Sequence, residues 1–414
     1  MAPSHVPWWR EPTRKQWASF CGAWLAWILD AFDVAIFLLA MPAISRELGV
    51  STIATTGSMA LTLLARLLGG AFAGAAADKW GRKLPLILAV VWFAICDGLI
   101  AVAPTFAAIL ALRTLFGLGM GAQYAAGMTL AMENWPERSR GIASGVLQGS
   151  WAIGNLVAGV IAAFVLPRFG FRALFAISVI PAVLLVVFLV LAVPESEEWL
   201  RTRGRRTDSK LAKATGGTAN LLWGCVTMAA GLGAYYALTT LYPTILETEL
   251  GLRPAKVGGL VALFYGGMLA GAITTGIIAA RRGTTLAIVV PALLAVPILP
   301  LYVGVDPRFL AVGAVLGGAF GVGFSGVVPL LLTQLYPAEQ RARLVGLSYH
   351  IGSALAAPVP VAIAWFSRAT STSLSRSVAF AALAFELLLV VLIVSRAVRP
   401  VTSINPAALS QESS

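Results

Sequence analysis

Twelve long apolar stretches constrain the fold of this 414-residue chain more than any other feature. Each has the roughly 20 mostly apolar residues that an α-helix needs to cross a bilayer. Charged residues make up only 12% of the chain, whereas soluble domains contain about 25%. We therefore expect an all-α integral membrane protein with twelve transmembrane helices. The stretches comprise residues 17–41, 54–77, 84–103, 106–128, 139–165, 172–193, 219–241, 257–280, 284–303, 308–332, 341–366 and 377–397.

The basic residues are distributed asymmetrically around these stretches. The formal net charge is +12, and twenty of the thirty Lys and Arg residues lie in tails and loops on the same side as the N-terminus. An excess of basic residues marks the cytoplasmic side of a membrane protein. We therefore expect a multi-pass protein of the cell inner (plasma) membrane with both termini in the cytoplasm. The same distribution accounts for the basic charge without nucleic acid as a partner.

Ionisable residues interrupt stretches that should otherwise be apolar. Asp30 and Asp33 lie in the first stretch, Arg66 in the second and Arg113 in the fourth. Each charge costs at least ~2.5–3.5 kcal/mol at the bilayer centre, so such residues face one another or a wet cavity and indicate a functional site. We expect a carboxylate–arginine centre in the N-terminal half. Asp97, near the end of the third stretch, is a weaker candidate, and local hydrogen bonding is its preferred interpretation.

Asp30 and Asp33 are three residues apart and therefore share one helical face. Two carboxylates this close repel each other where the dielectric constant is low, so one of them should take up a proton readily. Both are candidates for coupling transport to protons. The alternative is that both stay ionised and pair with Arg66 and Arg113, which would only lock the helices together.

The two arginines are suited to an organic anion, because a guanidinium group binds a carboxylate through two parallel hydrogen bonds. The alternative for Arg113 is that it only neutralises an aspartate. Other polar residues at helical spacing extend the candidate site, and for these the alternatives are hydrogen bonds between helices or, for the histidine, a packing role. The candidate substrate-binding residues are Arg66, Arg113, Gln123, Tyr124, Gln148, Trp151, Asn155 and His350.

A second group of charges lies at the predicted cytoplasmic ends of the helices. Residues 74–83 follow the pattern G-x-x-x-D-x-x-G-R-K, in which an acid ends one helix and basic residues follow a tight turn. Such a network can open and close as the two halves of a transporter rock. The candidate gating residues are Asp78, Arg82, Lys83, Glu133 and Arg140.

The chain contains an internal repeat. Trp135, Arg140 and Gly145 recur as aromatic, Arg and Gly at 336, 341 and 346, each 201 residues later. Residues 194–217 form the one long hydrophilic interruption. We therefore expect an N-terminal six-helix half at 1–193, a cytoplasmic linker at 194–217 and a C-terminal six-helix half at 218–414.

The pattern at 74–83, in a chain of twelve stretches and two parallel halves, resembles the loop signature of the major facilitator superfamily. The N-terminal half is further similar to the sialate:proton symporter group, which includes sialic acid and lactate permeases. The similar segments are 29–33, 65–70, 78–83, 113–124, 133–145 and 172–199. Two residues depart from the pattern of that group. Ala31 stands where Gly is usual, and Gln123 stands where Glu is common, which leaves the aspartates of the first stretch as the better proton sites.

The resemblance implies proton-coupled symport of a small organic anion, such as a monocarboxylate or a sialic acid, by alternating access. Substrate and proton are expected to bind near the bilayer midplane between the halves. A metabolite or drug exporter that works as a proton antiporter is the alternative. Two histidines and no Asp-rich loop argue against a membrane-embedded enzyme. We expect no cofactor and no metal, and a monomer whose partners are an organic anion, protons and the lipid bilayer.

Overall fold

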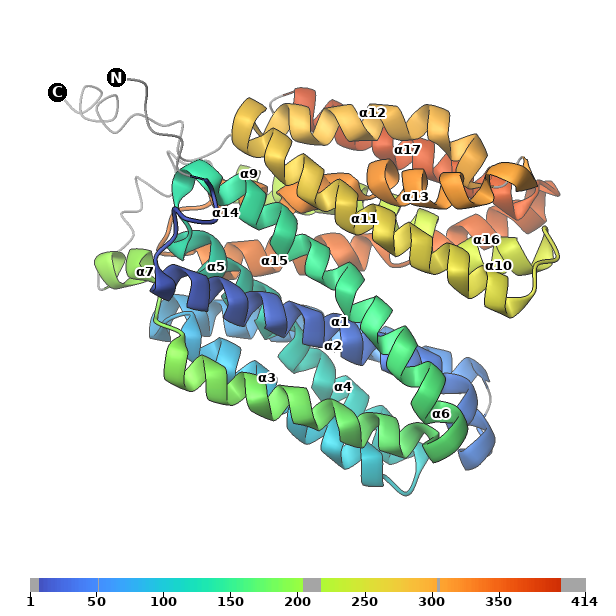
Figure 1. The fold of residues 1–414 in the computed structure, drawn as a ribbon, viewed down its shortest axis with the longest axis horizontal. Helices are drawn as coiled ribbons and strands as arrows, with labels where there is room; N and C mark the ends of the chain where they lie inside the picture. Colours follow the sequence, from blue (N-terminus) through green and yellow to red (C-terminus); the bar gives the residue numbers. More distant parts are fainter. Residues whose placement is uncertain (1–6, 51, 204–216, 304–305, 396–414) are drawn as a thin grey trace. The chain divides into compact units, whose positions relative to one another are not determined.

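The computed structural model describes residues 7–50, 52–203, 217–303 and 306–395. These residues form helices joined by short turns, and no strand occurs among them (Figure 1). The predicted all-α architecture is confirmed. Residues 204–216, which include most of the predicted linker, lie outside the described residues.

The chain divides into two compact units that are not simple halves of the sequence. The first unit contains residues 1–143, 150–203 and 338–346, and the second contains residues 144–149, 204–337 and 347–414. Each unit therefore includes a short segment from the opposite half of the chain. The site described below belongs to the first unit.

The first unit is built mainly from four long helices, the larger part of a fifth and two short ones. The π-helical turn Tyr124–Met128 separates α4 from α5, and the turn Glu137–Ser139 leads into α6. The helices are α1 (Arg14–Leu48), α2 (Thr52–Trp80), α3 (Lys83–Val102), α4 (Phe106–Gln123), α5 (Thr129–Asn134), α6 (Arg140–Ala192) and α7 (Glu197–Thr202).

The second unit is also helical, with α11 packed against α13 and α17 packed against both α9 and α12. Its helices are α9 (Gly217–Thr240), α10 (Tyr242–Thr248), α11 (Pro254–Arg282), α12 (Thr284–Tyr302), α13 (Leu310–Gly321), α14 (Val328–Leu335), α15 (Arg341–Ala356, whose first turn belongs to the first unit), α16 (Val359–Thr370) and α17 (Leu374–Val394).

The number of membrane-spanning segments agrees with the twelve stretches expected from the sequence. Eleven helical segments among the described residues are long and apolar enough to cross a bilayer. One of them runs from Glu137 to Ala192 and is interrupted at Gly170, whose φ of 72° and ψ of −179° are not helical. Counting this segment as two spans gives twelve, and the break falls between the predicted stretches 139–165 and 172–193.

Backbone-to-backbone packing of α2 against α4 brings the two intramembrane arginines into one region. A Cβ atom at Gly117 would collide with the carbonyl oxygen of Thr62, and one at Gly121 would collide with that of Arg66. The hydroxyl of Thr62 also donates to the carbonyl oxygen of Arg113, at 3.1 Å. Small residues four apart permit this close approach of membrane helices. The glycines that follow Arg113 therefore act in helix packing.

Candidate functional site

Asp30 of α1 and Arg66 of α2 form an ion pair inside the first unit. Arg66 Nη2 lies 4.0 Å from Asp30 Oδ2, and the side chains are 5% and 0% exposed. Asp30 also interacts electrostatically with Arg113. Because a buried charge is stable only when it is compensated, the pair explains how α1 and α2 both carry a charge within an apolar stretch.

Arg113 of α4 is enclosed by acids and aromatic rings. Its Nη1 lies 4.0 Å from Asp97 Oδ1, and its guanidinium carbon lies 4.2 Å from the ring centroid of Phe37 and 4.3 Å from that of Phe116. It also interacts electrostatically with Asp33. The side chain is fully buried, and its three guanidinium nitrogens make no hydrogen bond within the described residues. Cation–π contacts orient the guanidinium group while leaving its N–H donors available.

Asp97 of α3 joins this group, and its expected local hydrogen bonding is wrong. Asp97 interacts electrostatically with Asp33, and Ser178 Oγ donates a hydrogen bond to Asp97 Oδ2, at 3.0 Å. Its partners thus come from α1, α4 and α6, far away in the sequence. The sequence indicated Asp97 only as a weaker candidate for the site, with local hydrogen bonding as the preferred interpretation.

We call the set Asp30, Asp33, Arg66, Asp97 and Arg113 the charge centre. The structure brings together all four intramembrane charges that the sequence singled out and adds Asp97. All five side chains are at most 5% exposed. Their roles in binding substrate and protons remain predictions.

The neighbouring candidates of the first unit form an aromatic wall beside α1. The ring centroid of Trp27 lies 4.9 Å from that of Tyr124 and 5.4 Å from that of Trp151. Asn155 donates to the carbonyl oxygen of Trp151, at 2.9 Å, which is a hydrogen bond within α6 and not the bond between helices that its alternative predicted. Gln123 is buried, and its side-chain amide makes no hydrogen bond within the described part of the chain.

Two other substrate-binding candidates belong to the second unit. Gln148 is in the short segment 144–149, although it precedes Trp151 by only three residues. His350 lies on α15, with its ring 5.3 Å from that of Tyr349 and perpendicular to it. Both side chains are buried. Their roles stay predictions.

The predicted gating residues form a second charged cluster, which we call the gate cluster. Arg82 donates from Nε and Nη2 to the two carboxylate oxygens of Glu133, both at 3.1 Å, and from Nη2 to the carbonyl oxygen of Ala338, at 2.8 Å. Arg341 completes the cluster, with Nη1 3.1 Å from Glu133 Oε1 and 2.8 Å from Glu198 Oε2. Two arginines thus share one buried glutamate.

Asp78 binds the first turn of α15. It accepts hydrogen bonds from the backbone N–H groups of Ala342, at 3.1 Å, and Arg343, at 3.0 Å, and its Oδ1 lies 3.2 Å from Arg82 Nη1. A carboxylate is favourable at a helix N-terminus because it satisfies unpaired N–H groups and complements the helix dipole. Residues 338–346 are held in the first unit by these contacts and those of Ala338 and Arg341.

Two predicted gating residues lie at the edge of this cluster. Lys83 donates from Nζ to the carbonyl oxygen of Val190, at 3.0 Å, and Arg140 donates to the carbonyl oxygen of Trp135. Sequence reasoning missed Glu195, which accepts from the backbone N–H of Arg82, at 2.8 Å, and from that of Lys83.

Gly81 is required by this arrangement. Its φ of 99° is a conformation that other residues rarely adopt, and a Cβ there would collide with the Glu195 carboxylate. The glycine in the motif therefore lets a carboxylate reach the start of α3.

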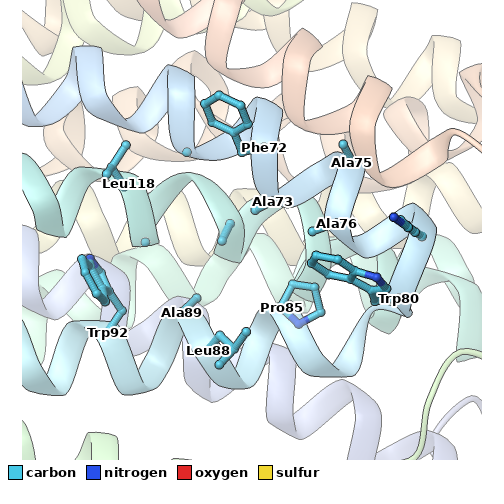
Figure 2. Close-up of a pocket in the computed structure, with 14 residues that line it drawn as sticks. Phe72, Ala73, Ala75, Ala76, Trp80, Pro85, Leu88, Ala89, Trp92 and Leu118 are labelled. Atoms are coloured by element: carbon cyan, nitrogen blue, oxygen red, sulfur yellow. The ribbon is translucent and has the colours of Figure 1, made fainter.

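A separate groove lies between α2, α3 and α4 (Figure 2). Its volume is about 640 Å³, and Phe72, Trp80 and Trp92 line it, while Lys79 is the charged residue of its lining. Phe72 is 74% exposed, as expected for a side chain that faces lipid tails in a membrane protein. The lining includes no residue of the charge centre, so we do not assign the groove to an anionic substrate.

Comparisons with known proteins identify the relatives of this chain. The sequence model of the Major Facilitator Superfamily matches residues 23–357. The sialic acid transporter NanX of Escherichia coli (strain K12) is 29% identical over 363 residues, which are 85% of this chain and 88% of that protein. The cis,cis-muconate transport protein of Acinetobacter baylyi (strain ATCC 33305 / BD413 / ADP1) is 28% identical over 369 residues, which are 86% and 89% of the two chains.

Solved structures show the same fold. The proton:xylose symporter XylE bound to 6-bromo-6-deoxy-D-glucose superimposes with a TM-score of 0.78 at 17% sequence identity. The match covers 92% of this chain and 95% of that one. This likeness confirms the predicted fold class, and the sequence match over residues 23–357 confirms the predicted superfamily.

Proposed function

Because this chain belongs to the major facilitator superfamily, we propose that it is a proton-coupled symporter that carries a small organic anion into the cell. Membership makes it a multi-pass membrane transporter rather than an enzyme, as the sequence predicted. The substrate class, the proton coupling and the orientation in the inner membrane are parts of the proposal.

The observation that carries the proposal is the environment of Arg113. Its buried guanidinium group is oriented by the rings of Phe37 and Phe116, and the carboxylate of Asp97 lies 4.0 Å away. The N–H donors of the group make no hydrogen bond within the described residues. A site that must bind and release an anion needs a fixed cation with donors to offer. An arginine that only stabilises the fold would be expected to use those donors in close hydrogen bonds.

The names of the relatives support a carboxylate as the anion. NanX is named for sialic acid and the Acinetobacter protein for cis,cis-muconate, and both compounds carry carboxylate groups. Arginine is the side chain best matched to a carboxylate, because its planar fork provides two parallel donors. We propose that Arg113 binds the substrate carboxylate and that Arg66 is held by Asp30.

Asp30 and Asp33 are the proposed proton-coupling residues. Both are buried beside the arginines, so a change in the protonation of either alters the balance of charge around the substrate-binding cation. In the gate cluster, we propose that the bonds of Asp78 and Glu133 to the segment 338–346 break and re-form during each transport cycle, at the cytoplasmic ends of the helices.

Entrance counterflow tests the substrate class without requiring an ion gradient. Purified protein is reconstituted into liposomes preloaded with unlabelled compound, and the entry of the labelled compound is followed. We expect counterflow of N-acetylneuraminate or cis,cis-muconate, competition by other small carboxylates and none by their amides. Counterflow that amides inhibit as well as acids would contradict the carboxylate assignment.

A further inference from the structure

The groove between α2, α3 and α4 has no part in the proposed transport mechanism. Its lining is apolar except for Lys79, and the lining residues Phe72, Trp80 and Leu88 are all exposed. The helices α2 and α3 that carry them are long and apolar enough to cross a bilayer. Exposed apolar patches of this kind mark sites of interaction with a membrane or a partner. The groove is therefore accessible from the bilayer.

Small side chains create the space within the groove. α2 packs much more closely on α4 than it does on α3. The lining residues Ala73 and Ala76 of α2, Ala89 of α3 and Ala122 of α4 are too short to fill the gap that remains. Its volume of about 640 Å³ lies within the range of ~300–1,000 Å³ that is usual for ligand pockets. The groove can therefore hold a ligand of substantial size.

Trp92 forms the inner end of the groove. Figure 2 shows Trp80 toward one end and Trp92 toward the other. The indole Nε1 of Trp92 donates to the carbonyl oxygen of Leu115, at 2.7 Å, and a Cβ atom at Gly119 would collide with the indole ring. The ring is thus held in place, and its polar N–H group is already used. The inner end therefore offers a fixed apolar surface.

The groove has the depth of one bilayer leaflet. Along α2 its lining extends from Gly69 to Trp80, a rise of about 16 Å, and half of the ~30 Å hydrocarbon core is about 15 Å. Trp80 ends one membrane-spanning helix and Lys83 begins the next, so this end of the groove lies at the membrane surface. An acyl chain of one leaflet matches this depth, whereas a neighbouring transmembrane helix would need a surface twice as long.

The charged residue of the lining lies at the surface end of the groove. Lys79 is in the last turn of α2 and is exposed, with Nζ 5.5 Å from the ring centroid of Trp80. Among the described residues it forms no ion pair. The preceding acid, Asp78, is bound to Arg82 and to the first turn of α15, so it does not compensate Lys79. A cation beside an apolar groove is complementary to an anionic head group that carries an acyl chain.

We propose that this groove binds an anionic glycerophospholipid, with one acyl chain lying from Trp80 to Trp92 and the phosphate group on Lys79. A zwitterionic lipid carries its own cation beside the phosphate and gains less from the lysine, so the anionic lipid is preferred. Trp80 suits the head-group level, because an indole ring has an apolar body and a polar N–H group. The site is separate from the charge centre and does not depend on the proposed transport activity.

The role of Lys79 is tested by native mass spectrometry of the full chain, purified in detergent and depleted of lipid. Phosphatidylglycerol and phosphatidylcholine with the same acyl chains are added in turn, and bound lipid is counted. We expect the wild type to retain more phosphatidylglycerol, and Lys79→Gln to weaken that binding about fivefold. Lys15→Gln, at an exposed lysine in the first turn of α1, is the control and should bind as the wild type does. Equal retention of the two lipids, or no effect of Lys79→Gln, would overturn the proposal.

The variant Ala76→Phe tests whether the acyl chain occupies the groove, because a phenyl ring fills part of its space. We expect it to lose bound phosphatidylglycerol while size-exclusion chromatography shows a folded protein. The same spectra report the oligomeric state. A wild-type dimer that Ala76→Phe dissociates would show that a second copy of this chain covers the groove, and would overturn the assignment to lipid.

Photo-cross-linking locates the lipid in the wild-type protein and needs no variant. Proteoliposomes contain phosphatidylglycerol with a diazirine group in one acyl chain, and the labelled peptides are identified by mass spectrometry. We expect labelling concentrated in residues 69–92 and 118–122 and suppressed by unlabelled phosphatidylglycerol more than by phosphatidylcholine. Labelling spread evenly over the membrane-spanning helices, or suppressed equally by both lipids, would refute a specific anionic-lipid site.

Discussion

At the scale of single residues, the two arginines of the charge centre differ in what surrounds them. Each forms an ion pair at 4.0 Å, Arg66 with Asp30 and Arg113 with Asp97, but Arg113 also contacts the rings of Phe37 and Phe116. The two arginines are both buried, but their different surroundings lead to different proposed roles. We propose that Arg66 stabilises α1 against α2 and that Arg113 binds the anion.

Replacing Asp33 by Asn is expected to abolish uptake driven by a proton gradient while leaving the protein folded. The amide is nearly isosteric with the carboxyl group but cannot take up a proton. Uptake by proteoliposomes with and without an inward proton gradient measures the effect, and size-exclusion chromatography checks folding. Normal gradient-driven uptake by a well-folded variant would refute the role of Asp33.

Replacing Arg113 by Lys is expected to weaken substrate binding by at least about tenfold, because a charged hydrogen-bond donor pair contributes ~1.5–3 kcal/mol and lysine lacks the planar fork. The positive charge is kept, so the charge centre remains balanced and the protein should fold. The concentration dependence of counterflow gives the apparent affinity. Arg172→Lys, which alters a partly exposed arginine paired with Glu47, is the matched control. Equal affinities in both variants would count against Arg113 as the anion site.

At the scale of elements, the packing of α2 against α4 depends on glycine. Gly117 and Gly121 place α4 directly against the carbonyl oxygens of Thr62 and Arg66. The separation of the two helices, and with it the positions of Arg66 and Arg113, is therefore determined at the backbone.

Replacing Gly117 by Ala should lower stability by ~1–3 kcal/mol, because a methyl group in this contact must push the helices apart. Gly159→Ala on α6 is the matched control, since a Cβ there meets nothing within 4 Å and Ala is a better helix former than Gly by ~0.8–1.0 kcal/mol. Thermal unfolding in detergent compares the two. We expect a lower midpoint for Gly117→Ala and an unchanged or higher midpoint for Gly159→Ala. The opposite order would show that the contact is not tight.

The sequence predicted the helices and the buried charged residues better than it predicted which residues those charges contact. Asp30, Asp33, Arg66 and Arg113 were recognisable because a charge in an apolar stretch needs an explanation. Asp97 was recognised only as a weaker candidate, and Ser178 and Glu195 were not recognised. Each contacts a residue distant in the chain and has no distinctive local pattern. Helical spacing also suggested one wall for Gln148, Trp151 and Asn155. The structure assigns Gln148 to the second unit, since the packing of α6 changes within one turn.

At the scale of the whole molecule, alternating access requires contacts that hold one state and can be released. The gate cluster fits this requirement because Glu133 is the shared partner of Arg82 and Arg341, and Asp78 binds the first turn of α15. Every one of these contacts is polar. In the proposed transport cycle, they can therefore be exchanged for water as the segment 338–346 is released.

Replacing Glu133 by Gln is expected to favour the released state, because breaking a buried ion pair by removing one partner costs ~3–5 kcal/mol. A cysteine introduced at Ala338, which is buried and contacts Arg82, should react with a membrane-impermeant maleimide several-fold faster in this background. The parent protein, labelled in parallel, corrects for Cys21, Cys96 and Cys225. Glu197→Gln, in the exposed pair with Arg201, is the control. Equal labelling in both backgrounds would argue against a gate at this cluster.

The most direct test of the central claim is uptake of labelled N-acetylneuraminate into proteoliposomes under an inward proton gradient. Proton-coupled symport predicts that the compound accumulates above its outside concentration and that a protonophore abolishes the accumulation. Entry that only equilibrates, with or without the gradient, would contradict coupling and would leave the three aspartates as structural partners of the arginines.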